Sequence, residues 1–170
     1  MIRTRLPLTR RTALAAVAAL AFALTPMTAH HALAYDEAST SAVNVDAKGV
    51  ALRGYDPVAY FTAGQPTLGS EAFQATHDGA RYHFASAANR DAFVKEPSKY
   101  APAFGGFCAM GAVFAKKLDG DPKLWKIVDG KLYLNVGEPA QKRWQEDIPG
   151  NISKATQNWP NIKAKAPKEL

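Results

Sequence analysis

Alternating apolar and polar positions on both sides of two Asp-Gly pairs predict two β-hairpins. Asp78-Gly79 joins the strands of the first hairpin, and Asp129-Gly130 joins those of the second. Asp-Gly is a strong signal for a two-residue hairpin loop, because both loop residues must adopt positive φ. One face of each hairpin is mainly apolar and needs a cover. The pattern therefore predicts an α+β fold, a small antiparallel sheet built from the two hairpins and packed by several short helices.

The loop length sets the register of each hairpin. In the first, Gln74 pairs with His83, which places His83 on the more polar face; the apolar face then holds Phe73 and Phe84, which pair with each other. In the second, the apolar face holds Trp125, and the other face carries lysines and a tyrosine.

Helix signals surround the hairpins. Ser86 is a predicted N-cap, and Pro97 ends the helix that follows it. Asp56 before Pro57 is an N-cap with proline at the first helical position. Helices are predicted after Pro57, over residues 87–95, from about residue 107, over 139–147, where Pro149-Gly150 ends the helix, and from 152 to Pro160.

The first 34 residues have the features of a secretory signal peptide. Four arginines precede a 13-residue apolar stretch, residues 12–24, which is too short to span a bilayer. Ala32-Leu33-Ala34 is a small-x-small cleavage site, which predicts a cut after Ala34. Residues 9–14 also resemble a twin-arginine export signal. We therefore expect a periplasmic or secreted protein with no stable membrane anchor after cleavage.

Removing this leader changes the charge argument. The full chain has a formal net charge of +6, and the leader holds four arginines and no acidic residue, so the mature chain carries +2. No basic face interleaved with aromatic residues remains, which argues against a nucleic-acid partner. The predicted organisation is a flexible lead-in over 35–49, one domain over 50–160 and a solvated basic tail over 161–170.

Cys108 is the single cysteine and the first candidate for chemistry. One cysteine excludes an intramolecular disulfide and an all-cysteine zinc site. Cys108 follows Gly105-Gly106 and lies near a predicted helix start, where thiol pKa values are lowered. This position indicates a reactive thiolate or a ligand for a soft metal. The alternative is a small, buried apolar residue.

Three further side chains are candidate ligands. His83 could bind a metal or transfer a proton, or it could be a solvent-facing strand residue. Met110 could join Cys108 in holding Cu(I), or it could fill a gap in the core. Tyr60 could line the same site, or it could be a core residue with its hydroxyl at the rim.

Several spaced motifs together resemble the YHS domain, over about residues 50–160. The motifs are Asp56-Pro57-Val58 with Tyr60; Gly79-x-x-Tyr82-x-Phe84-x-Ser86; Phe93-x-x-x-Pro97-x-x-Tyr100; Gly105-Gly106-Phe107-Cys108-Ala109; Trp125; Gly130-Lys131-Leu132-Tyr133-Leu134; and Asn158-Trp159-Pro160. The later motifs are similar to those of stand-alone exported bacterial YHS proteins.

The resemblance implies less about chemistry than about fold. YHS domains suspected of binding metal carry one cysteine after Asp-Pro-Val and a Cys-Ser-x-x-Cys at the helix start. Ala59, Ala85 and Asn89 stand at those positions here, so that cysteine site is not implied. The cysteine of Gly-Gly-x-Cys-Ala remains, and here it is Cys108.

These observations predict a non-enzymatic protein of the cell envelope that binds a metal ion or a small ligand. Cu(I) is the favoured metal because the candidate ligands include soft sulfur atoms. The candidate metal site consists of Cys108, His83, Met110 and Tyr60. One alternative is a thiol-dependent redox enzyme or sensor that uses Cys108. Another is a structural or interaction domain without a chemical site.

Overall fold

A computed structural model of the chain describes Met1 and residues 36–170. The predicted leader and its cut after Ala34 therefore lie outside the described residues. Within residues 36–170, none of the helices has the length and apolar character needed to cross a membrane.

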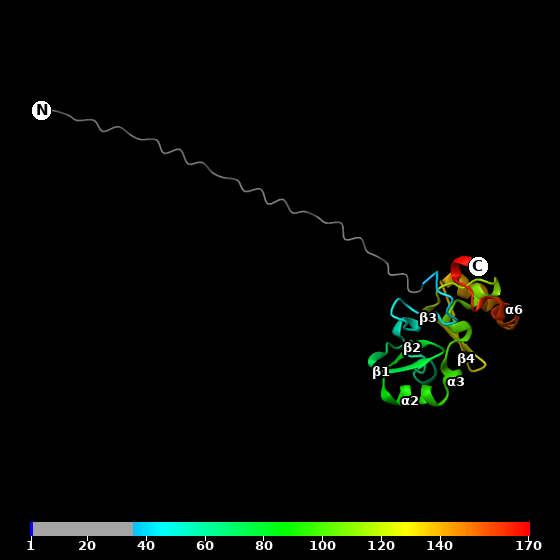
Figure 1. Ribbon diagram of the computed structural model, residues 1–170, viewed down its shortest axis with the longest axis horizontal. Coiled ribbons are helices and arrows are strands. Elements are labelled where there is room, and N and C mark those ends of the chain that lie inside the picture. Colours follow the sequence, from blue (N-terminus) through cyan, green and yellow to red (C-terminus); the bar gives the residue numbers. More distant parts are fainter. Residues whose placement is uncertain (2–35) are drawn as a thin grey trace. The chain divides into compact units, whose positions relative to one another are not determined.

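The structure contains helices and two antiparallel hairpins, which confirms the α+β class (Figure 1). The strands are β1 (Ser70–His77), β2 (Ala80–Phe84), β3 (Asp121–Val128) and β4 (Lys131–Asn135). The helices are α1 (Ala59–Thr62), α2 (Ala87–Lys95), α3 (Pro97–Tyr100), α4 (Ala109–Val113), α5 (Glu138–Glu146) and α6 (Ile148–Ile162), with short 3-10 turns at Leu52–Gly54, Ala103–Gly106 and Pro167–Glu169. The hairpins form two separate two-stranded sheets, so the expected single sheet is corrected.

The first hairpin has the predicted register near its loop. Asp78 and Gly79 adopt φ of 48° and 76°, and Gln74 pairs with His83. The expected pairing of Phe73 with Phe84 is wrong, because β1 bulges and Ser70 takes the place opposite Phe84. The bulge follows a close backbone crossing at residue 69, a glycine at which a Cβ atom would lie 2.4 Å from the carbonyl carbon of His83.

The second hairpin is buried more completely than its pattern indicates. Its register is as predicted, with Trp125 opposite Leu134. Leu132 and Leu134 pack into one hydrophobic cluster, while Tyr133, between them, packs into another. Successive residues of a strand point to opposite faces, so β4 separates two cores and is covered on both sides.

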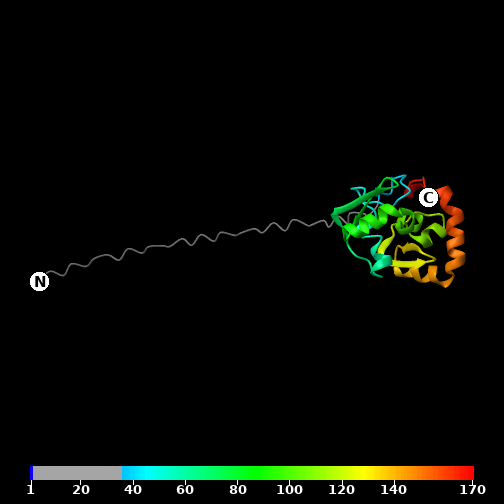
Figure 2. The same cartoon turned by 90° about the horizontal axis from the view of Figure 1, so that it is seen from below.

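The first cluster gathers the aromatic residues of β2 and α2 against α1. Tyr82 and Phe84 both contact Phe93, with ring centroids 4.8 and 5.1 Å apart. The second cluster lies between β4 and the C-terminal helices and contains Cys108 and Trp144. In both views the green β1–β2 half and the orange-red α6 lie on opposite sides of the domain (Figures 1 and 2).

The helix caps follow the sequence signals, but two predicted helix ends are wrong. Pro160 is the predicted end of the last helix, but it lies inside α6, which continues to Ile162. Ser86 Oγ accepts the N–H of Asn89 at 3.2 Å, as an N-cap does. The predicted break at Pro149-Gly150 is misplaced, because both residues lie in the first turn of α6. Asp147 caps that turn by accepting the N–H of Gly150 at 3.0 Å. Proline fits there because the first helical turn does not need its missing N–H.

Parts of both ends of residues 36–170 pack against the rest of the domain. Val43 is 5% exposed, and Ala166 in the tail is 1% exposed. Lys117 holds both ends: its Nζ donates to the carbonyl oxygens of Ser41 at 2.7 Å and of Lys165 at 2.7 Å. A lysine whose partners are backbone carbonyls leaves no mark in the local pattern, which is why these segments look unattached in the sequence.

Candidate functional site

Cys108 reaches its position through the preceding tight turn. Phe104, Gly105 and Gly106 all have positive φ, which bends the chain sharply before the cysteine. Gly105 is required there because a Cβ atom would lie 1.9 Å from the carbonyl oxygen of Ala42. Cys108 then bridges to Leu134 of β4 and becomes the N-cap of α4.

The thiol of Cys108 is buried and held as a thiol. Its Sγ accepts the N–H of Gly111 at 3.3 Å and lies 3.7 Å from Oδ1 of Asn135. That oxygen also accepts the N–H of Met110, which orients the Asn135 amide so that the thiol must donate to it. Cys108 itself has no solvent-exposed surface.

The expected activation of Cys108 is therefore wrong. Burial raises the pKa of the Cys108 thiol, and the hydrogen bonds from Gly111, Val136 and Met110, which act in the opposite direction, do not outweigh it. A helix start lowers a thiol pKa only where the charged form stays adequately solvated. Here the surroundings favour the neutral form.

Cys108 is expected to resist alkylation in the native protein. Iodoacetamide at pH 8 should label it at least about 100-fold more slowly than the same protein in urea, because access requires local opening of the fold. Intact-mass spectrometry over time measures both rates, and the urea sample is the control for reagent activity. Equal labelling rates in the two samples would support the hypothesis that Cys108 is a reactive thiolate.

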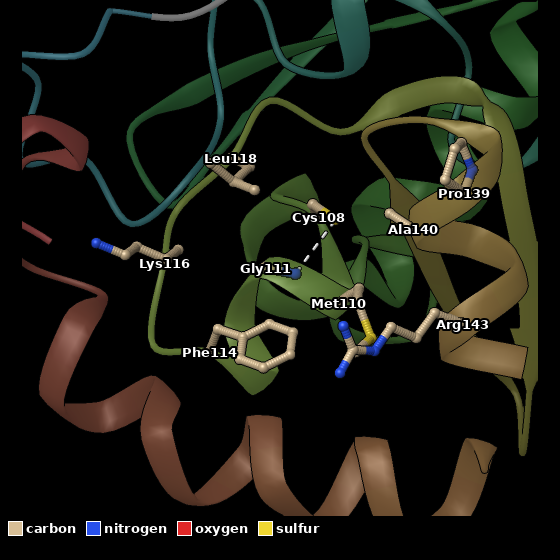
Figure 3. Close-up of a pocket in the computed structure, with 9 residues that line it drawn as sticks. All are labelled: Cys108, Met110, Gly111, Phe114, Lys116, Leu118, Pro139, Ala140 and Arg143. Carbon is tan, nitrogen blue, oxygen red and sulfur yellow. Dashed lines mark hydrogen bonds between the residues drawn. The ribbon is translucent and has the colours of Figure 1, made fainter. Parts of the chain in front are cut away.

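A pocket of about 310 Å³ lies over Cys108 (Figure 3). α4 supplies Met110 and Gly111, the following loop supplies Phe114, and α5 supplies Ala140. Most of this lining is apolar, and Cys108 lies beneath the floor.

The structure brings two of the four predicted ligands together. Cys108 and Met110 border the same pocket. His83 lies on β2, between strand neighbours that pack into the first cluster, and its Nδ1 approaches Gly54. His83 is 8% exposed, so the solvent-facing alternative for it is wrong.

The side chain of Tyr60 makes a hydrogen bond and a ring contact within the core. Its hydroxyl donates to the carbonyl oxygen of Pro122 at 2.8 Å, and its ring packs edge-on against Trp125. Burial, with smaller contributions from Tyr55 and two carboxylates, raises its pKa. Phenolate coordination of a metal through Tyr60 is therefore disfavoured.

Acidic and classical metal ligands do not gather elsewhere in the part of the chain that the structure describes. Across residues 36–170, no three side chains of His, Cys, Asp or Glu lie in a group that could hold a metal ion. A site built from Cys108 and Met110 has only two protein ligands in place.

Asp56 does more than the sequence pattern indicates. As predicted, it caps the turn before α1: its Oδ1 accepts the N–H of Val58 at 2.8 Å and of Ala59 at 3.3 Å. Its Oδ2 accepts a hydrogen bond from the N–H of Ala85 at 2.9 Å and another from Nδ2 of Asn89 at 2.6 Å. One buried carboxylate thus joins α1 to the start of α2.

Sequence reasoning missed the cationic and aromatic residues of the pocket. The guanidinium of Arg143 lies 5.1 Å from the centre of the Phe114 ring. Phe114 is 53% exposed, which is unusual for a large aromatic side chain. The two residues belong to different elements, and no periodicity links them, so only the fold shows that they meet.

Comparison of the chain with known protein families, with curated proteins and with solved structures found no match in any of the three.

Proposed function

We propose that this chain is an exported, YHS-like domain of the cell envelope that binds a small molecule non-covalently, without catalysing a reaction. The observation that carries this proposal is the apolar pocket over Cys108 and Met110. Its volume of about 310 Å³ is at the lower end of the range for small-molecule sites. Such a pocket fits one compact ligand.

The Asp56 junction supports the resemblance to YHS domains. Ala59, Ala85 and Asn89 stand where metal-binding relatives carry cysteines, and all three donate hydrogen bonds to the Asp56 carboxylate. Positions far apart in sequence thus converge, as the ligands of one metal would have to. In this chain a carboxylate and hydrogen bonds occupy that place.

The state of Cys108 favours binding over thiol chemistry. A thiol-dependent enzyme or sensor needs an accessible thiolate. Cys108 is buried, and its pKa is raised. The redox alternative therefore requires an opening of the pocket floor before any reaction.

Cu(I) is the second candidate ligand. The observation that favours it is the shared position of Cys108 and Met110 beside one pocket, because thiolate and thioether sulfur select Cu(I). Two cationic side chains, Lys116 and Arg143, also border the pocket, and they disfavour a metal cation.

Native mass spectrometry of the protein purified from the cell envelope of its own host tests the proposal. We expect a chain that begins at Tyr35 and carries an organic adduct that is lost on denaturation. Ala140→Trp, which places a large ring in the pocket, should be purified without the adduct. A copper isotope pattern in place of the organic adduct would favour the Cu(I) site. Protein without any adduct in both samples would favour the alternative, a structural or interaction domain without a ligand.

A further inference from the structure

We propose that the ligand is a monocarboxylate with a compact apolar body, and that Arg143 binds its carboxylate. This inference rests on the proposed small-molecule function of the pocket and adds the chemical class of the ligand. It is carried by the charges around an otherwise apolar space.

The walls of the pocket select an apolar body. Met110 and Phe114 lie on the α4 side, Leu118 lies on the loop, and Ala140 lies on α5. A thioether and an aromatic ring both pack favourably against an aromatic ligand. The volume of about 310 Å³ admits a single ring with a short side chain and not a long acyl chain.

The charge at the pocket is positive. Lys116 and Arg143 border it, and none of the described residues that line it is acidic. Figure 3 shows the Arg143 guanidinium beside Met110 and facing Phe114, whereas the amino group of Lys116 extends away from the other labelled side chains. Arg143 is therefore the cation that a ligand in this space would meet.

Arg143 has no acidic partner within residues 36–170. No carboxylate of that part of the chain lies within 4.0 Å of its guanidinium. Glu146 and Asp147 border a neighbouring pocket that also includes Arg143, but neither forms an ion pair with it. The contact that holds the guanidinium is the ring of Phe114. Its hydrogen-bond donors thus remain available for a carboxylate.

The geometry suits a carboxylate better than a spherical cation or a neutral group. A guanidinium presents paired N–H donors in one plane and binds a carboxylate through two parallel hydrogen bonds. The ring of Phe114 packs against the guanidinium of the exposed Arg143, whose N–H donors stay accessible to a ligand. The apolar body then lies over the floor formed by Met110.

Titration of the ¹⁵N-labelled mature chain with 3-phenylpropionate, followed by amide chemical shifts, tests the class of ligand. We expect shifts at Gly111 and Ala140 and a Kd on the order of 0.1–1 mM, from the binding energy typical per ligand atom. The neutral analogue 3-phenylpropanamide should bind about tenfold more weakly or worse, because it cannot form the charged pair.

Two variants of matched charge assign the effect to one residue. Arg143→Gln should weaken 3-phenylpropionate binding about tenfold and leave binding of the amide unchanged. Lys142→Gln, which removes the same charge from the adjacent exposed position of α5, should leave both affinities unchanged. Dispersed spectra of both variants establish that they are folded.

The outcomes separate this inference from the function on which it rests. Equal affinities for the acid and the amide, or full affinity in Arg143→Gln, overturn the carboxylate assignment while the pocket function stands. If neither probe changes any amide chemical shift, the carboxylate assignment is also wrong. The native mass spectrometry experiment then tests the pocket function by itself. Equal weakening in Lys142→Gln and Arg143→Gln shows general electrostatic attraction and overturns the role of Arg143.

Discussion

Replacing Asp56 with alanine is expected to lower the free energy of unfolding by about 4 kcal/mol. The carboxylate is fully buried and accepts four hydrogen bonds from α1 and from the β2–α2 junction. Alanine leaves the N–H of Ala85 and the amide of Asn89 without their acceptor. Urea denaturation monitored by tryptophan fluorescence measures the loss.

Asp46→Ala is the matched control. Asp46 Oδ1 also accepts two backbone N–H groups, from Lys48 and Val50, but it lies in a local turn near the surface. Water replaces the lost acceptor there, so the expected cost is below about 1 kcal/mol. A cost for Asp56→Ala no larger than that of the control would show that the two elements are held together without the carboxylate.

Asp56→Asn separates shape from charge. The side chain keeps its size, but one oxygen becomes an NH₂ group that opposes the donors of Ala85 and Asn89. We expect a loss of about 3 kcal/mol. Recovery of most of the stability in Asp56→Asn would contradict the role given to both oxygens.

Replacing Lys117 with methionine is expected to cost about 3 kcal/mol and to loosen both ends of the domain. Lys117 is 1% exposed, and its Nζ donates to three carbonyl oxygens, those of Ser41, Lys163 and Lys165. Methionine has a similar length and no donor, so the carbonyls lose their shared partner. Hydrogen exchange should accelerate at Asn44 and Lys168, whose N–H groups donate to the carbonyl oxygens of Gly105 and Glu37 and so attach the two end segments.

The pH dependence of this variant has a defined sign. Burial lowers the pKa of Lys117 below its ordinary value of 10.5. The unfolded chain therefore binds the proton of Lys117 more tightly than the folded chain does. Burying the charged amine lowers the stability of the fold, and this loss disappears as the pH rises from the lowered pKa towards 10.5. The stability advantage of the wild type over Lys117→Met should then grow as the pH is raised from neutral towards 10.5.

Lys116→Met is the control for a lysine beside the same loop, because Lys116 is exposed. We expect a change of less than about 0.5 kcal/mol and no pH-dependent difference from the wild type. An equal cost for the two variants, or unchanged exchange at Asn44 in Lys117→Met, would show that the ends of the domain are held by other contacts.

Local signals predicted the hairpins and most helix starts correctly. Asp78-Gly79 and Asp129-Gly130 adopt the positive φ that their turn requires, and Ser86 caps α2 as expected. These features depend on a few neighbouring residues, so a short stretch of sequence contains the information that decides them. Pro149 shows the limit, because a proline fits either after a helix or in the first turn of the next one, and the Asp147 cap decides between them.

Burial could not be predicted in the same way. The apparently polar face of β4 is covered because a second cluster of helices packs against Tyr133. The helix-start position of Cys108 predicted a depressed pKa, yet burial raises it, because the solvent that would stabilise a thiolate is excluded by residues distant in sequence. His83 is buried for the same kind of reason, since the loop at Gly54 covers it.

The sequence by itself determined the α+β class, the two hairpin registers near their loops and the caps, since each depends on backbone preferences within a few residues. Only the tertiary structure decided which side chains meet. Asp56 and Asn89 are 33 positions apart, and Arg143 reaches Phe114 from another helix. Such contacts arise when packed elements exclude water, and no local pattern records which surfaces come together. The pocket and its positive charge therefore belong to the fold, while Cys108 and Met110 were visible in the sequence beforehand.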